Sequence, residues 1–298
     1  CQDYTPERKI SPIIYLMNKE AHFRIWQKAF RKTFTLNSIL AAAGTAYFAF
    51  FSFFPLVLLI VAIASRWFDP LWVESELITQ LEFIVPGITR FLGDNLAKVV
   101  QNRGSITTTA LLLLLWSGST LFSIVARVMD SIWEGRDTRS TLRYRGLALL
   151  FVIGLSILVL PLLIMGTWLT PLINGLLPNL APFLLSSVSF LFSTFVSIVL
   201  FGLLYRFLPH TSPAWHDIWI AAIAAGFLWE IAKRIFLSYT ASFLTSSNLV
   251  YGSVSTIIVF LAWVHLSGLI FFFGAYLGVE YRGQGEKERR KMTRRKSD

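Results

Sequence analysis

Two long stretches without any charged residue constrain the fold of this chain more than any other feature. Residues 146–205 and residues 235–279 contain no Asp, Glu, Lys or Arg. A transmembrane α-helix needs about 20 predominantly apolar residues, so each stretch is long enough to cross a bilayer twice. Of the 298 residues, 55% are hydrophobic and 15% are charged, whereas a soluble domain has about 25% charged residues. The sequence therefore predicts an all-α, polytopic membrane protein.

Turn signals between the apolar segments divide the chain into six predicted transmembrane helices. Pro, Gly and Asn residues between positions 171 and 182 separate the third span from the fourth, and the polar residues 245–248 separate the fifth from the sixth. The predicted spans cover about residues 38–64, 105–126, 147–168, 183–205, 218–239 and 252–280. We expect a membrane domain over residues 38–281, preceded by a basic flank at 1–37 and followed by a basic tail at 282–298.

Amphipathic segments outside these spans predict helices that lie at the membrane interfaces. Over residues 13–34, aromatic side chains recur on one face of a helix and basic side chains on another; they are Phe23, Trp26, Phe30 and Phe34, and Arg24, Lys28 and Arg31. Such a helix lies in the headgroup layer with its aromatic rings in the acyl boundary. Two more amphipathic helices are expected within residues 66–104, either at the opposite interface or over a cavity.

The distribution of positive charge predicts that both termini are cytoplasmic. Seven Lys and Arg residues lie before residue 33, five lie within 127–145, one is Arg206 and eight follow Glu280. The six-span arrangement puts these 21 residues on one side of the membrane, against four in the first loop on the other side. Lys and Arg accumulate in cytoplasmic loops, which is the positive-inside rule.

The residue types that catalysis and metal binding need are not clustered in this sequence. No HxH or HExxH motif contains any of the four histidines, His22, His210, His216 and His265. A single cysteine excludes a disulfide within the chain and a thiolate metal cluster. The basic tail lacks aromatic residues that could stack on bases, so attraction to anionic lipid headgroups explains its charge more simply than RNA does. We expect no enzyme activity, cofactor, metal or nucleic-acid partner, and we expect membrane lipids as partners. A homo-oligomer is compatible with the sequence.

Three charged residues inside the fifth span form the sharpest candidate site. Glu230, Lys233 and Arg234 are spaced i, i+3 and i+4, so they project from one side of a helix. Each charge at the bilayer centre costs about 2.5–3.5 kcal/mol on insertion scales. One interpretation is a self-neutralising pair with a basic side chain that extends to the outer headgroups. The other is an anionic-substrate site that faces the bundle interior, with Glu230 within reach of a polar group on the sixth span.

Further candidates each have a functional and a structural interpretation. His265, near the middle of the sixth span, either joins two helices by a hydrogen bond or takes part in proton-linked transport. Arg206 and Arg127 either bind a lipid phosphate or fix the orientation of the protein. Gly274 and Gly278 form a small-xxx-small pair, which packs helices within the protomer or joins two protomers.

Four segments of the sequence carry a resemblance to a known family. They are AAAGTAYFAFFSFFPLVLL (41–59), LYRFLP (204–209), LWEIAKRIF (228–236) and, the most specific, NLVYGSVSTIIVFLAWVHLSGLIFFFGA (248–275). Over nearly its whole length the chain resembles the YihY/BrkB family of bacterial inner-membrane proteins, which share this length and a six-span organisation. His265 and Tyr276 depart from the family pattern, in which Tyr and Glu are usual at these positions.

The resemblance implies an inner-membrane location and a general function. Members have been called ribonuclease BN, a name generally regarded as a misattribution, and serum-resistance or virulence factors; some are suspected of exporting lipid or lipopolysaccharide precursors. We therefore expect a protein that transports or flips an amphipathic, anionic, lipid-like substrate in envelope biogenesis. A non-transporting scaffold for envelope proteins is the alternative. A membrane-associated ribonuclease is a second alternative, disfavoured because nuclease chemistry needs a metal or an acid–base cluster.

Overall fold

The computed structural model describes residues 19–64, 107–133, 181–209, 211, 213–251 and 254–297. The helices in these residues are α1 (Lys19–Thr33), α2 (Leu36–Ala64), α5 (Thr107–Ile132), α7 (Ala181–Phe207), α8 (Trp215–Tyr251) and α9 (Val254–Ser297). No strand occurs in this part of the chain, and the all-α prediction is confirmed. The predicted span 147–168 and the interfacial helices predicted within 66–104 lie outside the described residues.

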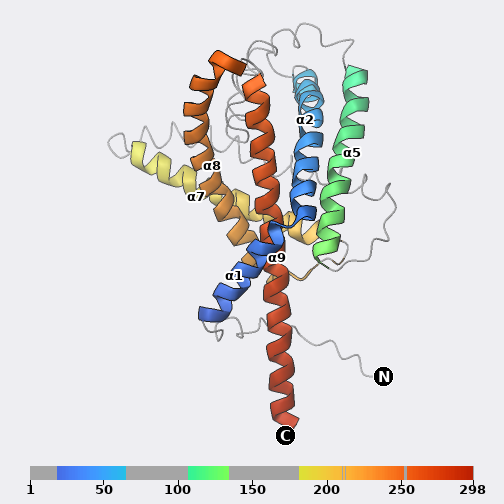
Figure 1. Cartoon of the computed structure of the whole chain (residues 1–298), viewed down its shortest axis with the longest axis vertical. Helices are drawn as coiled ribbons and strands as arrows, with labels where there is room; N and C mark the ends of the chain where they lie inside the picture. Colours follow the sequence, from blue (N-terminus) through green and yellow to red (C-terminus); the bar gives the residue numbers. More distant parts are fainter. Residues whose placement is uncertain are drawn as a thin grey trace.

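Helix α9 lies at the centre of the described structure and packs against more of the other helices than any other helix does (Figure 1). Helices α1, α2 and α8 each pack against it, while α5 packs against α2 and α7 against α8. In Figure 1, α2 and α5 stand side by side on one flank of α9, and α8 lies on the other flank. Helix α1 crosses α9 obliquely, and the C-terminal part of α9 extends well beyond α1.

Proline residues explain several helix boundaries. Pro182 lies in the first turn of α7, where its missing N–H would have no partner within the helix. Pro209 lies two residues after the end of α7, and Pro213 lies two residues before the start of α8. Within α2, the helix continues past Pro55, although an internal proline removes one backbone hydrogen bond.

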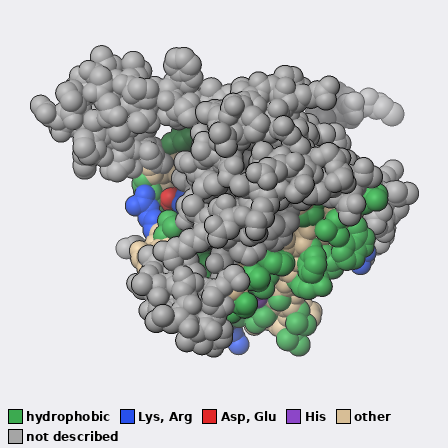
Figure 2. Space-filling model, turned by 90° about the horizontal axis from the view of Figure 1, so that it is seen from above, with side chains coloured by type: hydrophobic (Ala, Val, Ile, Leu, Met, Phe, Trp, Pro, Cys, Tyr) green, Lys and Arg blue, Asp and Glu red, His purple; other side chains and the backbone are tan. Residues whose placement is uncertain are grey.

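Four described helices are long and apolar enough to cross a membrane. The qualifying segments are Leu36–Phe53 in α2, Leu112–Ile132 in α5, Phe190–Phe207 in α7 and Ile257–Gly285 in α9. Helix α8 does not qualify within the described residues, and it carries the charged residues at 230, 233 and 234. The described part of the surface in Figure 2 consists mainly of hydrophobic side chains, as expected of a surface in contact with lipid. The number of spans, six, stays a prediction.

Glycine and alanine residues mark the helix crossings. A Cβ added at Gly268 of α9 would lie 3.3 Å from the Cβ of Ala42 on α2. At the α7–α8 crossing, a Cβ at Gly226 would lie 2.7 Å from Cγ1 of Ile198 and 2.9 Å from its backbone nitrogen. Small residues let two helix backbones approach closely, which supplies much of the packing energy in a membrane.

The glycine pair of α9 packs inside the protomer. Added Cβ atoms would meet Ala225 of α8 at 2.8 Å from Gly274, and Ala221 at 3.2 Å from Gly278. A Cβ at Gly274 would also collide with the hydroxyl of Tyr205, which donates a hydrogen bond to the carbonyl of Phe271. The pair therefore serves packing within the protomer, the first of its two interpretations.

Two predicted boundaries are wrong. Residues 245–248 are helical because α8 continues to Tyr251; Ser and Thr can bond to carbonyls of the preceding turn and so are tolerated within a helix. The second predicted span, 105–126, ends too early, since α5 extends to Ile132. The basic tail predicted from residue 282 forms the last part of α9, which continues to Ser297, because Glu, Lys and Arg favour helix.

Candidate functional site

Glu230 and Lys233 lie buried in the α7–α8 interface with Ser193. The relative exposure of the three residues is 2%, 4% and 5%. Nζ of Lys233 lies 2.9 Å from Oε2 of Glu230 and donates a hydrogen bond to Oγ of Ser193 at 3.0 Å. Oγ of Ser193 in turn donates to Oε2 of Glu230 at 2.8 Å. We call these three residues the buried triad. Its two charges compensate each other, as buried charges must.

The close approach of α7 and α8 makes this short-range network possible. Gly226 lies one turn before Glu230, and Ile198 lies just over one turn after Ser193. Because Gly226 has no side chain, α8 lies directly against the backbone of α7 at Ile198. A serine side chain is short, so it reaches a partner on a neighbouring helix only where the two backbones are close.

Arg234 lies at the exposed edge of the buried triad. Its side chain is 58% exposed, and its Nε lies 3.9 Å from Oε1 of Glu230. Its guanidinium carbon lies 4.3 Å from the ring centroid of Phe190 on α7, a cation–π contact. The expectation that all three charged residues face the interior is therefore wrong for Arg234. Positions three and four residues after Glu230 diverge by about 100° around a helix, so only Lys233 turns into the interface.

The polar partner of Glu230 also differs from the expected one. We expected a group on the sixth span, but the hydroxyl that bonds Glu230 belongs to Ser193 on α7. His265 is half-buried on α9 and belongs neither to the buried triad nor to the cavity described next. A similar depth along two helices does not determine which helix faces which.

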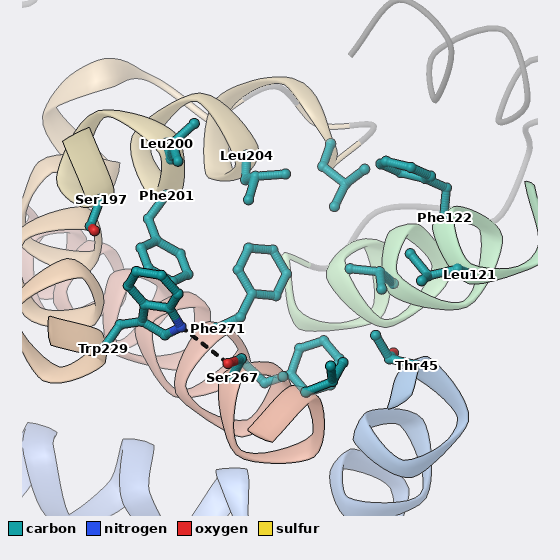
Figure 3. Close-up of a pocket in the computed structure, with 15 residues that line it drawn as sticks. Thr45, Leu121, Phe122, Ser197, Leu200, Phe201, Leu204, Trp229, Ser267 and Phe271 are labelled. Atoms are coloured by element: carbon teal, nitrogen blue, oxygen red, sulfur yellow. Dashed lines mark hydrogen bonds between the residues drawn. The ribbon is translucent and has the colours of Figure 1, made fainter. Parts of the chain in front are cut away.

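An apolar cavity of about 320 Å³ lies beside the buried triad (Figure 3). Helices α2, α5, α7, α8 and α9 all contribute side chains to its wall. The wall is almost entirely hydrophobic, with hydroxyl groups at Thr45, Ser197 and Ser267. Nε1 of Trp229 donates a hydrogen bond to Oγ of Ser267 at 3.1 Å, which satisfies the indole N–H at the cavity wall (Figure 3).

One tryptophan separates the cavity from the buried triad. Trp229 lines the cavity, and Nζ of Lys233 lies 5.3 Å from its ring centroid. Ser197, one helical turn after Ser193, lines the same cavity. An apolar volume therefore adjoins a charged cluster of Glu230, Lys233 and Arg234, whose formal charges sum to one positive charge. This combination suits a molecule with an apolar chain and an anionic head.

The other predicted site residues lie apart from this centre. Nη1 of Arg206 donates a hydrogen bond to the carbonyl of Pro213 at 2.5 Å, so it ties the end of α7 to the start of α8. Arg127 is exposed on α5. Asp130, one turn after Arg127 on α5, is buried at 2% exposure.

Sequence reasoning missed Ser193 and the cavity. A signal for Ser193 exists, because Ser186, Ser189, Ser193 and Ser197 recur every three or four residues in an uncharged segment. Such spacing puts hydroxyl groups on one face of a helix. No comparable signal marks the cavity, whose wall comes from five helices. Within the described residues, no group of three or more His, Cys, Asp or Glu side chains could hold a metal ion.

The helical architecture, the hydrophobic surface and the four apolar helices define the class: this is an all-helical integral membrane protein. The chain belongs to the family described as Virulence factor BrkB, whose sequence pattern matches residues 30–297. The resemblance found in the sequence is thereby confirmed.

The chain is similar to several UPF0761 membrane proteins. It is 30% identical over 205 residues to one from Ralstonia nicotianae and 26% identical over 216 residues to one from Halorhodospira halophila; each alignment covers 68% of this chain and 45% of the relative. The chain therefore spans about half the length of these two relatives. A relative from Haemophilus influenzae is 26% identical over 268 residues, which is 87% of this chain and 95% of the relative. No solved structure matches the chain.

Proposed function

We propose that this BrkB-family membrane protein binds an amphipathic, anionic, lipid-like molecule and transports or flips it in envelope biogenesis. The observation that carries the proposal is the apolar cavity beside the charged cluster, with Trp229 between them. Ligand cavities in proteins typically have about 300–1,000 Å³, and the cavity of about 320 Å³ lies at the lower end of this range. A segment of a single acyl chain is the natural occupant of so apolar a volume.

Arg234 is the cation best placed to contact an anionic headgroup. The charge of Lys233 is compensated by Glu230 at 2.9 Å, and both side chains are buried. Arg234 is more than half exposed, and its contact with Phe190 orients the guanidinium. A planar guanidinium binds phosphate through two parallel hydrogen bonds. In this proposal Arg234 contacts the headgroup, while Glu230 and Lys233 hold α8 against α7.

Lipid identified by mass spectrometry on protein purified in mild detergent tests the proposal. Leu200→Trp introduces a large side chain at the cavity wall, and we expect at least a threefold loss of bound lipid. Leu191→Trp is the matched control, because Leu191 lies on the same helix at 67% exposure and does not line the cavity. Equal lipid content in both variants and the unmodified protein would contradict the proposal.

The headgroup is tested with a second pair of variants. Arg234→Gln should lower the ratio of anionic to zwitterionic lipid that co-purifies, whereas Arg127→Gln, at an exposed position of α5 that does not line the cavity, should leave the ratio unchanged. The same change of ratio in both variants would indicate a general effect of surface charge and would remove Arg234 from the site.

The proposed location is the inner membrane, with both termini in the cytoplasm. The excess of Lys and Arg in the terminal flanks and in 127–145 supports this orientation. Reporters fused after Asp298 or inserted near Arg139 should be active only in the cytoplasm, and a reporter near Asn95 should behave as exported. An exported C-terminus would contradict the six-span arrangement.

A non-transporting scaffold is the second candidate function. The observation in its favour is the C-terminal part of α9, which extends beyond the other described helices in Figure 1 and carries eight Lys and Arg residues after Glu280. A scaffold requires this extension and not the cavity. If truncation after Gly285 abolishes function while Leu200→Trp leaves it intact, the scaffold is the better account.

A further inference from the structure

Helix α1 has three faces of different chemistry, and the first packs against α9. Ile25 and Ala29 are buried at 1% and 0% exposure, and they pack with Phe273, Leu277 and Tyr281 of α9. Two polar contacts strengthen this docking. Nζ of Lys32 lies 2.6 Å from Oε1 of Glu280, and Nδ1 of His22 is hydrogen bonded to the hydroxyl of Tyr281 at 2.9 Å. The orientation of α1 about its own axis is therefore fixed.

The second face of α1 is a row of exposed aromatic side chains, which we call the aromatic row. Phe23, Trp26, Phe30 and Phe34 are 71%, 45%, 57% and 51% exposed. The ring of Trp26 packs 5.6 Å from that of Phe273, and the rings of Phe30 and Phe34 are 4.7 Å apart. Four large rings in a row form a contiguous apolar surface, and such a surface on a folded protein marks contact with a membrane or a partner.

The aromatic row continues onto the exposed side of a helix long enough to span the membrane. After Phe34 the chain enters α2, where Leu36, Leu40 and Tyr47 are 70%, 60% and 54% exposed. The first apolar segment of the chain begins at Leu36. One residue, Thr35, separates Phe34 from Leu36 in the sequence, so the aromatic row leads directly into the exposed apolar side chains of α2.

The position of α1 along α9 corresponds to the membrane–water boundary. Helix α1 docks at Phe273–Tyr281, near the end of the apolar segment that closes at Gly285. Glu280 and Arg282 are the first charged residues of α9 in this direction. Aromatic side chains at this depth reach the acyl boundary from the headgroup layer, as in monotopic amphipathic helices.

The third face of α1 is basic and points away from α9. Arg24, Lys28 and Arg31 are exposed on it, and the acidic residue nearby, Glu20, is paired with Arg24. This charge favours an anionic surface. A second copy of the chain would bring like charges together, which is unfavourable. Anionic headgroups attract basic residues near the membrane surface.

We propose that α1 is a membrane-surface helix that packs against α9 near the end of its apolar segment. Its aromatic row inserts into an anionic leaflet, and its basic face lies among the lipid headgroups. The interaction does not depend on a transported substrate, so its test is independent of the proposed function. Because α1 is docked on α9, it fixes the depth at which the bundle sits in the bilayer.

Single spin labels on the full-length protein test this proposal. Cys1→Ser removes the single cysteine of the sequence, after which a cysteine is introduced at Phe30 on the aromatic row or, as the matched control, at Lys28 on the basic face. The protein is reconstituted into vesicles of phosphatidylcholine with or without phosphatidylglycerol. The collision rates of each label with oxygen, which partitions into lipid, and with a water-soluble nickel chelate are measured.

We expect the Phe30 label to collide several-fold more often with oxygen than with the nickel chelate, and the Lys28 label to show the reverse. Phosphatidylglycerol should increase the contrast, and this increase should disappear when Arg24 and Arg31 are replaced by Gln. A Phe30 label accessible to the nickel chelate would overturn the proposal. A label shielded from both agents would also overturn it, because a protein partner would then cover the row. Phe23→Cys, at the most exposed position of the row, provides an independent label if Phe30→Cys lowers the yield of folded protein.

Discussion

Two lysine–glutamate pairs of similar length occupy contrasting regions of the molecule. Lys233 and Glu230 lie 2.9 Å apart in the α7–α8 interface, with side chains only 5% and 3% exposed. Lys32 and Glu280 lie 2.6 Å apart between α1 and α9, with side chains 48% and 14% exposed. By distance alone, the Lys32–Glu280 pair would be expected to stabilise the fold more than the Lys233–Glu230 pair.

Burial reverses this ranking. Breaking a buried ion pair leaves an uncompensated charge, which costs about 3–5 kcal/mol, whereas an exposed pair contributes only about 0–1 kcal/mol. The buried pair also has Ser193 as a third member, and the α7–α8 contact that surrounds it is too close for a side chain at Gly226. The surroundings of an ion pair, more than its length, determine what the fold loses when it is broken.

The largest effect is expected from neutralising one member of the buried pair. Glu230→Gln leaves the ammonium of Lys233 without this counter-ion, whereas Lys233→Gln leaves the carboxylate with Arg234, whose Nε lies 3.9 Å from Oε1 of Glu230. Glu230→Gln should lower the free energy of unfolding by about 3–5 kcal/mol, and Lys233→Gln should lower it by less, because Arg234 still compensates part of the charge of Glu230. The double variant should lose much less than the sum, because neither charge then remains. Thermal unfolding in detergent measures all three.

The double variant decides between the two roles of the pair. If each single variant keeps its stability and yield but loses bound anionic lipid, the pair belongs to the binding site and its structural role is contradicted. If stability falls in both single variants and recovers in the double variant, the pair holds α7 against α8, as the geometry indicates.

The next largest effect is expected at the helix crossing beside the buried pair. Gly226→Ala would place a methyl group within 3 Å of the Ile198 backbone, so α7 and α8 must separate. Overpacking of this kind costs about 1–3 kcal/mol. Gly283→Ala is the control, since a Cβ there would have no neighbour within 4 Å. Equal stability of the two variants would show that α7 and α8 are not in close contact.

Removing the hydroxyl of Ser193 should have an effect of similar or smaller size. Ser193→Ala deletes one hydrogen bond to Glu230 and one from Lys233. Because the two charges still compensate each other at 2.9 Å, we expect a total loss of about 1.5–3 kcal/mol, the size of one hydrogen bond to a charged group. Thr194→Ala is the neighbouring control, because its hydroxyl bonds only to the carbonyl of Phe190 in its own helix in the described structure. A larger loss in Thr194→Ala would indicate that the hydroxyl of Ser193 is not part of the network.

The same contrast explains what the sequence could predict. Helix formation follows from local composition, so the apolar runs at 38–64 and 183–205 predict helices that the structure has as α2 and α7. The charges at 230, 233 and 234 identify the candidate site, because charge within an apolar segment is energetically costly. Both the apolar composition and the charged residues are properties of one continuous segment, so they are visible in the sequence alone.

What the sequence could not predict depends on which helices are neighbours. The spacing of Lys233 and Arg234 relative to Glu230 does not say which of the two faces a partner helix, and the structure buries only Lys233. Ser193 is 37 residues from Glu230, and no local pattern links them. Likewise, polar residues at 245–248 resemble a turn, but one polar turn does not end a helix as long as α8.

The smallest effect is expected from the exposed pair, and it makes the comparison quantitative. Lys32→Gln removes the contact with Glu280 but leaves the buried face of α1, with Ile25 and Ala29, in place. The free energy of unfolding should fall by no more than about 1 kcal/mol. Lys28→Gln on the basic face of the same helix is the control, and 0.5 M salt should reduce the difference between the two variants, because salt screens exposed charges. A cycle with Glu280→Gln isolates the coupling between Lys32 and Glu280. If that coupling equals or exceeds the coupling between Lys233 and Glu230, the 2.6 Å distance would outweigh burial, and the ranking of the two regions would be reversed.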